Sequence, residues 1–173
     1  MRIEKCREAD VAEVGAFYET MVRWLNSHIN YPKWIHGVYP TKATAREHTA
    51  AGDQYVCRDG RDIVAAFILN DDPQGNYQKG NWSQPLDDGE YMVLHTLAVA
   101  PDQQGKGIGA QILRFCADKA KAEGYKALRV DIVPGNRPAQ KLYEKNGFRC
   151  AGIFDLERGI EGIPEFILYE LAV

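Results

Sequence analysis

The sequence predicts an α/β (α+β) fold: a single domain of residues 1–173 with a mixed central sheet of about seven strands and about four flanking helices. Two observations carry this prediction. Short alternating or continuous apolar segments, typical of strands, are interleaved with segments whose apolar residues recur at helical spacing. In the second half, strand and helix patterns follow one another in turn, an order typical of mixed sheets covered by helices. The composition, 45% hydrophobic and 26% charged residues, is ordinary for a globular protein.

The first half of the chain is expected to form a strand, two helices and a hairpin. Alternation over residues 2–6 predicts a short strand, and apolar residues at helical spacing predict a helix over 11–25. Thr41 and Gly52 are suitable residues to begin and end a second helix. The Asp-Gly pair within 54–70 is typical of a tight turn between two strands.

The second half begins with a long polar loop, residues 71–90, and then alternates between strands and helices. One helix is expected after the glycine turn near residue 107, ending at Gly124, and another after Asn136, which is a good N-cap. The expected strands are residues 91–100, 127–133, 149–154 and 164–171.

Composition limits the possible classes of function. A formal net charge of −3 and a pI near 5.8 provide no global attraction to nucleic acid or to an anionic membrane. The opening residues lack the apolar core of a secretory signal, and the longest apolar run, Ile63–Leu69, is too short to cross a bilayer. We therefore expect a cytoplasmic protein, a monomer or homodimer, that binds neither nucleic acid nor membrane. The four cysteines lie far apart, without metal-ligand spacing, and are expected to be reduced and mostly buried, with no metal site: Cys6, Cys57, Cys116 and Cys150.

The stretch "LAVAPDQQGKGIGAQILRF", residues 97–115, places three glycines between a predicted strand and a predicted helix. Inside a helix, each of Gly105, Gly107 and Gly109 would cost about 1 kcal/mol relative to alanine. Bare backbone at this position is typical of a site where a phosphate or another anion approaches the N–H groups at a helix start.

A dinucleotide-binding loop is the main alternative for this stretch. Residues 105–110 satisfy the pattern GxGxxA, and Asp131 follows at about the distance of a ribose-binding acid. However, "APDQQ" separates the strand from the glycines, and too few residues follow Asp131 to complete a doubly wound domain. The Walker pattern is absent. A glycine turn that merely reverses the chain is the third alternative.

The segment "LAVAPDQQGKGIG" resembles the acyl-CoA loop of the GNAT superfamily of N-acetyltransferases, whose pattern is Arg or Gln, two residues, Gly, one residue, Gly or Ala. Gln104, Gly107 and Gly109 match it. The resemblance covers Tyr91 to about Ile153 and continues through "GYKALRVDIVPGNRPAQKLYEKNGF", where the family places Asn136, Ala139, Leu142, Tyr143 and Gly147. It implies a largely antiparallel sheet splayed between the strands at 91–99 and 127–133, and acetyl-CoA as cosubstrate.

The resemblance also implies how acetyl-CoA is bound. Backbone N–H groups of the glycine loop would hold the pyrophosphate, helped by the charge of Lys106. The pantetheine arm would lie along the preceding strand, where a bulge or splay would free backbone groups. The expected cosubstrate-binding residues are Leu97, Ala98, Val99, Gln104, Gly105, Lys106, Gly107, Ile108, Gly109, Ala110, Asn136 and Tyr143.

Acetyl transfer needs a base for the amine, a donor for the oxyanion and an acid for the thiolate. Tyr143, two helical turns after Asn136, is the expected acid, in a position where the family often has a tyrosine. His95 is the expected base, since "LHTLAV" looks like the strand that carries a catalytic histidine in aralkylamine acetyltransferases; Glu90 is the reserve. The Leu97 N–H is the expected oxyanion donor. The alternatives are that Tyr143 and His95 only pack in the core and that Glu90 is a solvated turn residue.

The acceptor site is the least defined part. In the family, the loop between the first two helices walls this site, and the long polar loop could close it on the other side. The expected acceptor-binding residues are Tyr31, Trp34, His36, Tyr39, Tyr77 and Trp82. Aromatic walls suit an apolar or cationic amine, and the alternative is that these aromatic residues pack to hold their loops in place. The predicted function is transfer of an acetyl group to the primary amine of a small molecule by direct attack in a ternary complex. A sensor that binds acyl-CoA without turnover, or a protein N-terminal or lysine acetyltransferase, remains the alternative.

Overall fold

The computed structural model describes all residues, 1–173, and contains seven strands, four α-helices and three short 3-10 helices. The strands are hydrogen-bonded in the order β1-β2-β3-β4-β5-β7-β6. β4 and β5 pair in parallel, whereas β1–β2, β2–β3, β5–β7 and β6–β7 pair antiparallel. The mixed, largely antiparallel α/β fold predicted from the sequence is therefore confirmed.

Contacts between residues divide the chain into two compact units. The first contains Met1–Leu69 and His95–Ile112, and the second contains Asn70–Leu94 and Leu113–Val173. Each unit is described by itself below. The grouping of residues 1–173 into one domain stays a prediction.

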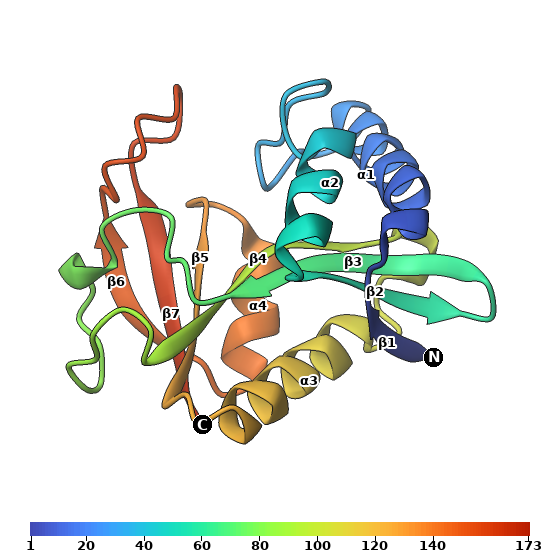
Figure 1. The fold of residues 1–173 in the computed structure, drawn as a ribbon. Helices are drawn as coiled ribbons and strands as arrows, with labels where there is room; N and C mark the ends of the chain where they lie inside the picture. The colour runs from blue at the N-terminus through green and yellow to red at the C-terminus, as the bar shows by residue number, and fades with distance from the viewer. The chain divides into compact units, whose positions relative to one another are not determined.

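The first unit has two helices over strands of the sheet. Its elements are β1 (Arg2–Lys5), η1 (Glu8–Asp10), α1 (Val11–Asn26), α2 (Lys42–Ala51), β2 (Gln54–Asp59), β3 (Asp62–Asn70), the end of β4 (Tyr91–Val99), η3 (Pro101–Gln103) and the start of α3 (Ile108–Ala122). Figure 1 shows α1 and α2 on the same face of β2 and β3. Their contact is a buried apolar cluster to which α1 contributes Val14 and Tyr18, α2 contributes Ala45, and the two strands contribute Val56 and Ala66. The predicted caps of α2 are confirmed: the Thr41 side chain accepts from two backbone N–H groups, and Gly52 is left-handed.

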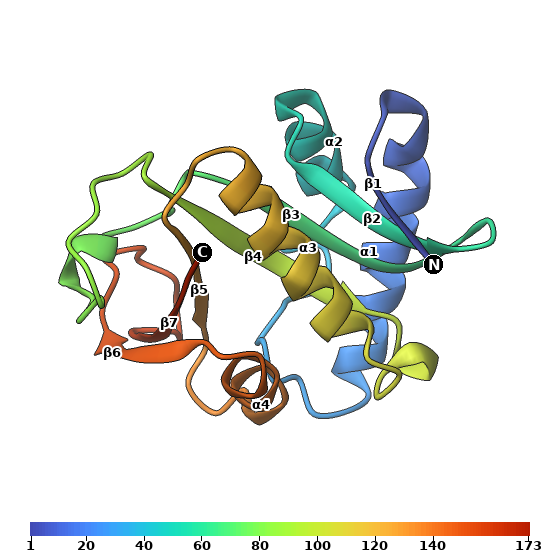
Figure 2. The same cartoon turned by 90° about the horizontal axis from the view of Figure 1, so that it is seen from below.

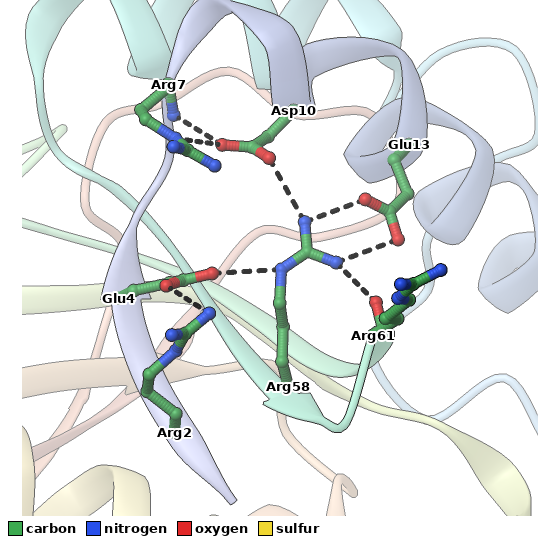
Figure 3. A network of polar contacts seen from close by, with 7 residues as sticks. All are labelled: Arg2, Glu4, Arg7, Asp10, Glu13, Arg58 and Arg61. Atoms are coloured by element: carbon green, nitrogen blue, oxygen red, sulfur yellow. Dashed lines mark hydrogen bonds and ion pairs between the residues drawn. The ribbon is translucent and has the colours of Figure 1, made fainter.

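A charged network ties the start of the chain to the hairpin (Figure 3). Arg58, on β2, donates through Nε to Glu4 Oε1 at 3.0 Å. Its Nη1 donates to Glu13 Oε1 at 2.9 Å and to the Arg61 carbonyl at 2.7 Å. Its Nη2 donates to Asp10 Oδ1 at 3.2 Å and to Glu13 Oε2 at 2.7 Å. All five N–H groups of this guanidinium are therefore used.

The second unit is built on a pair of antiparallel ladders. Its elements are η2 (Tyr77–Lys79), the start of β4 (Tyr91–Val99), most of α3 (Ile108–Ala122), β5 (Ala127–Ile132), α4 (Arg137–Lys145), β6 (Arg149–Phe154) and β7 (Phe166–Ala172). β7 pairs with β5 from Ala127↔Ala172 to Ile132↔Ile167 and with β6 on its other edge. Figure 2 shows α4 beside β6. Ring contacts of Tyr143, on α4, with Phe148 and Tyr169 pack the helix against this part of the sheet.

The long polar loop, residues 71–90, is fastened along β6 in the same unit, as the green segment beside β6 in Figure 1 shows. The Asn81 N–H donates to the Ala151 carbonyl at 2.8 Å, and the Asn76 N–H donates to the Leu156 carbonyl at 2.9 Å. Arg149 Nη2 donates to the Asn81 carbonyl at 2.6 Å. The loop therefore has the backbone bonds of an ordered segment although it contains only one turn of 3-10 helix.

The cysteines agree with the expectation from the sequence, since Cys6, Cys57 and Cys116 are buried thiols and Cys150 is exposed. None of the helices combines the length and the apolar character needed to cross a membrane.

Candidate functional site

The glycine loop has the geometry of an anion cradle. Gly105 and Gly107 have φ values of 78° and 81°, in the left-handed region that residues with a Cβ rarely adopt. A Cβ placed on either glycine would meet no protein atom within 4 Å, so the space beside both is open. α3 begins directly afterwards at Ile108, and the Gln111 N–H donates to the Gly107 carbonyl at 3.1 Å. The unpaired N–H groups of a helix start therefore lie next to open, bare backbone.

The side chains around these glycines leave them uncovered. Gln104 turns back, with Nε2 donating to the Val99 carbonyl at 3.2 Å. Lys106 is exposed, and its Nζ donates to Gln103 Oε1 at 3.0 Å. An exposed cation, bare backbone and a helix N-terminus are together suited to a diphosphate. These residues therefore fit the phosphate end of acetyl-CoA.

The strand before the loop is irregular at Thr96. This residue has φ 53°, although it lies within β4 and is β-branched. A residue held in that region costs of order 1–3 kcal/mol, comparable to the roughly 0.5–1.5 kcal/mol that one hydrogen bond contributes. Thr96 has such a bond: its Oγ1 is hydrogen-bonded to the hydroxyl of Tyr39. The sequence predicted a bulge or splay at residues 97–99, and the irregularity that the structure has lies at Thr96, one residue before that segment.

His95, the expected base, is 8% exposed within β4. Glu90, the reserve, is engaged in a turn: its Oε2 accepts from the Asp87 N–H at 2.9 Å, and its Oε1 is paired with Lys126 Nζ. The lysine, and then the Asp87 N–H, hold the pKa of Glu90 below its ordinary value. A carboxylate stabilised in this way is a poor proton acceptor, which favours the turn role for Glu90.

The aromatic residues between α1 and α2 form a compact group in the first unit. The rings of Trp34 and Tyr39 meet edge to face at 6.4 Å, and an isolated β-bridge joins Ile35 to Tyr39. The Asn30 side chain binds both backbone groups of Trp34: Asn30 Nδ2 donates to the Trp34 carbonyl at 2.7 Å, and Asn30 Oδ1 accepts from the Trp34 N–H at 3.1 Å. Tyr31 is half-buried in the same loop.

His36 points toward α1 rather than toward this aromatic group. Its Nε2 accepts from Arg23 Nε at 3.3 Å and lies 3.6 Å from Glu19 Oε1. All three side chains are well exposed.

In the second unit, Asn136 directly precedes α4 and Tyr143 lies on it. Asn136 caps the helix, with Oδ1 accepting from the Ala139 N–H at 3.3 Å, as the sequence predicted. Tyr143 is 5% exposed, and no hydrogen bond engages its hydroxyl. Burial, with a smaller contribution from the charge of Asp131, raises the pKa of Tyr143 above its ordinary value of 10.0. The phenol is therefore fully protonated at neutral pH, and the same burial makes it a weaker acid than an exposed tyrosine.

Tyr77 belongs to the buried core of the second unit, and Trp82 is partly buried against it. Tyr77 is 1% exposed, and its hydroxyl donates to Asp131 Oδ1 at 2.5 Å. Trp82 Nε1 donates to the Tyr77 carbonyl at 2.6 Å. Arg158 also holds Asp131, at 2.8 and 2.6 Å. The acceptor-binding role of the two rings stays a prediction, and Asp131 lacks the free carboxylate that the dinucleotide alternative requires.

Arg129, on β5, is a buried charge that sequence reasoning did not single out. It is 0% exposed, and its Nε donates to Glu170 Oε2 at 2.9 Å. Its guanidinium carbon lies 4.0 Å from the ring centroids of both Trp82 and Tyr91. Its two terminal nitrogens have no hydrogen-bond partner. Glu170 is 3% exposed and also accepts from the backbone N–H of Ser83, at 2.8 Å, and from the Ser83 hydroxyl.

Residues 19–148 match the model of the acetyltransferase (GNAT) family. The chain belongs to this family. Two relatives from Pseudomonas, each an L-methionine sulfoximine/L-methionine sulfone acetyltransferase, are 30% identical over 95 residues, 55% of this chain and 55% of theirs. The chain thus spans about half the length of these first relatives. The L-amino acid N-acyltransferase MnaT of Escherichia coli (strain K12) is 26% identical over 153 residues, 86% of this chain and 79% of that protein.

Solved structures share the GNAT fold. A GNAT-family acetyltransferase from Streptococcus agalactiae 2603 superposes with a TM-score of 0.78 at 14% identity, over 99% of this chain and 95% of that chain. Another, from Listeria monocytogenes 4b F2365, has a TM-score of 0.74 at 15% identity, over 99% and 94% of the two chains.

The structure brings the predicted GNAT site residues together in two groups. The first unit holds the glycine loop, the strand residues 95–99 and the aromatic residues 31–39, joined by the bond between Tyr39 and Thr96. The second unit holds Asn136 at the start of α4 and Tyr143 on it, together with Glu90, Tyr77 and Trp82. Sequence reasoning missed Thr96. No sequence signal could have found it, because threonine is a common strand residue and its backbone angle depends on contacts elsewhere in the chain.

Proposed function

We propose that this GNAT-family protein is an acetyl-CoA-dependent N-acetyltransferase that acetylates the amino group of a small, amino-acid-like molecule. The observation that carries the proposal is the open cradle of two left-handed glycines at the start of α3. The names of the relatives, which are acyltransferases for amino acids and amino-acid analogues, support the choice of acceptor. The cytoplasm is the proposed compartment, because acetyl-CoA is supplied there.

The proposed reaction is direct. The amine nitrogen attacks the thioester carbon, its proton passes to His95, and the Leu97 N–H stabilises the oxyanion. The carbon–sulfur bond then breaks, and the CoA thiolate takes the Tyr143 proton. The three buried cysteines are disfavoured as acetyl carriers, because the thiolate is the nucleophilic form of cysteine and burial opposes its formation. Burial raises the pKa of Cys6 to about 12 and also raises the pKa values of Cys57 and Cys116.

Thiol release from acetyl-CoA, measured with a panel of amino acids and other amines, tests the activity. We expect release only when a suitable amine is present. A thermal shift by CoA without release for any amine would favour the sensor alternative, since binding to the folded state stabilises it whether or not turnover follows. A shift by NAD but not by CoA would contradict the proposal.

Gly107→Val tests the cradle. Valine is strained at this positive φ and projects into the open space where a phosphate would lie, so we expect CoA affinity to fall at least tenfold. Gly124→Val is the matched control, because Gly124 has φ 85° and equally open surroundings. Both variants lose some stability from backbone strain, and only Gly107→Val should lose CoA binding.

Tyr143→Phe tests the acid while keeping the ring contacts of α4. General acid catalysis contributes about 10²–10⁴-fold, so we expect kcat to fall at least tenfold, with acetyl-CoA affinity nearly unchanged. Tyr169→Phe is the control: it removes a neighbouring hydroxyl that donates to Glu144 Oε1 at 2.9 Å and should retain activity. If kcat survives in Tyr143→Phe while the chemical step limits the rate, Tyr143 only packs and CoA leaves as the thiolate.

A further inference from the structure

The conformation of Thr96 is not explained by its local sequence. Its neighbours in β4 are His95 and Leu97, with no glycine or asparagine that would favour a positive φ, and threonine itself prefers extended geometry. A strained residue persists where the surrounding structure holds it. The contact available to Thr96 Oγ1 is the hydroxyl of Tyr39, 57 positions earlier in the chain.

Tyr39 itself is held by its own loop. Its N–H donates to the Ile35 carbonyl at 3.0 Å, closing the isolated bridge between these residues. Its ring meets Trp34 edge to face, and Trp34 packs against the buried cluster of the first unit. The backbone bond to Ile35 and the ring contact with Trp34 therefore hold the Tyr39 side chain in place beside Thr96.

We propose that Tyr39 is a positioning residue: its hydrogen bond to Thr96 Oγ1 holds the left-handed backbone of β4 and so fixes the direction of the following Leu97 N–H. This inference rests on the proposed function, in which that N–H stabilises the oxyanion. It gives Tyr39 a role different from the acceptor wall expected from the sequence. The side chain acts on the reaction through the backbone and need not touch the acceptor.

Two conservative variants remove the bond from either end. Tyr39→Phe keeps the ring against Trp34, and Thr96→Val keeps the β-branched shape. Since loss of an entire oxyanion donor costs about 10²–10³-fold, a misdirected donor should lower kcat about tenfold in each variant, with the acceptor KM unchanged. The double variant should be no worse than either single one, because both remove the same interaction. Tyr125→Phe, which loses an exposed hydroxyl bond to Asp71, is the matched control and should retain full kcat.

Glycine at position 96 provides the rescue. Because glycine adopts a positive φ without strain, Thr96→Gly in the Tyr39→Phe background should recover at least half of the lost kcat. If Tyr39 acts instead by touching the acceptor, Tyr39→Phe should change the acceptor KM, Thr96→Val should be silent, and glycine should rescue nothing. That pattern would overturn the proposal.

A readout without turnover separates this inference from the proposed function. Backbone chemical shifts of Thr96 and Leu97, recorded without acetyl-CoA, should report a left-handed Thr96 in the wild type and move toward extended values in Tyr39→Phe. Unchanged shifts in a folded Tyr39→Phe would overturn the positioning role whatever the activity. If the wild type acetylates no amine, the proposed function fails, while the shifts still decide whether Tyr39 holds Thr96.

Discussion

Arg58 in the first unit and Arg129 in the second are both buried arginines on strands, yet they are satisfied in opposite ways. Arg58, 8% exposed, uses all five N–H groups on three carboxylates and a carbonyl (Figure 3). Arg129, 0% exposed, has one carboxylate, two aromatic faces and two terminal nitrogens without a hydrogen bond.

The difference lies in what remains when the arginine is removed. The carboxylates around Arg58 have side chains 11–48% exposed, so water can hydrate them. Glu170 beside Arg129 has a side chain only 1% exposed, and water cannot easily reach it. The number of bonds an arginine makes is therefore a poor guide to the loss its removal causes. The burial of its partner is the better guide.

The largest expected effect is that of Arg129→Met. Methionine fills the space between the two rings but leaves Glu170 as an uncompensated buried charge, so we expect a loss of about 3 kcal/mol in the free energy of unfolding. Urea denaturation measures it. If Arg129→Met lost less stability than Arg58→Met, the burial of the partner would not be the better guide to the loss.

A smaller loss, about 2 kcal/mol, is expected for Arg58→Met, because charge-assisted hydrogen bonds disappear but their carboxylates become hydrated. The comparison is sharpened by repeating both measurements near 1 M salt, where the Debye length is about 3 Å. The Arg58→Met loss should shrink there, whereas the Arg129→Met loss should not. Equal salt dependence would show that the two environments are alike.

The pair replacement Arg129→Met with Glu170→Gln is expected to change the free energy of unfolding by about 1 kcal/mol or less. Replacing a whole buried ion pair is often neutral, since the desolvation of both charges is removed with their attraction. Glutamine keeps an acceptor for the Ser83 N–H, whose donor bond holds the long loop. A double variant as unstable as Arg129→Met would mean that packing, and not the unpaired charge, causes the loss.

The smallest expected effect is a pH dependence specific to the Arg58 network. Burial alone would raise the pKa of Asp10, but bonds from Arg7 and the charges of Arg7 and Arg58 together lower it below 3.8. A folded pKa below the unfolded one contributes stability above the unfolded pKa, and this is lost as pH falls through the folded value. The free energy of unfolding should therefore decline below about pH 4, and less steeply in Asp10→Asn. Parallel curves for the two proteins would exclude Asp10 as the source.

Short-range signals predicted most of the fold. Thr41 and Gly52 bound α2, and Asn136 caps α4, because each acts on backbone within four residues. The hairpin is also where the Asp-Gly pair predicted it, although its turn residues are Gly60 and Arg61, since Asp59 is still paired with Asp62. The glycine loop could be predicted for the same reason, because its motif lies within one short segment of the chain.

Contacts between distant residues could not be predicted. The sequence leaves open whether Tyr77, on a polar loop, lines the acceptor site or packs to hold the loop. The structure buries it, and its hydroxyl donates to Asp131, a partner 54 positions later that no local signal indicates. The charge of Arg129 is tolerated in a strand because Glu170 lies opposite it in the β5–β7 register. The alternation of residues 127–133 predicts the strand but does not reveal this partner.

The fastened loop 71–90 has a consequence for how the protein could be cut or extended. Long connections are the usual sites of proteolytic nicking and of tolerated insertions, because their ends can move apart without breaking the core. Here the middle of the connection contributes Tyr77 and Leu86 to the buried cluster of the second unit. A protease or an inserted peptide would have to pull out part of that interior. The loop is therefore expected to resist nicking, and it is a poor place for a tag or a cleavage site despite its length and polarity.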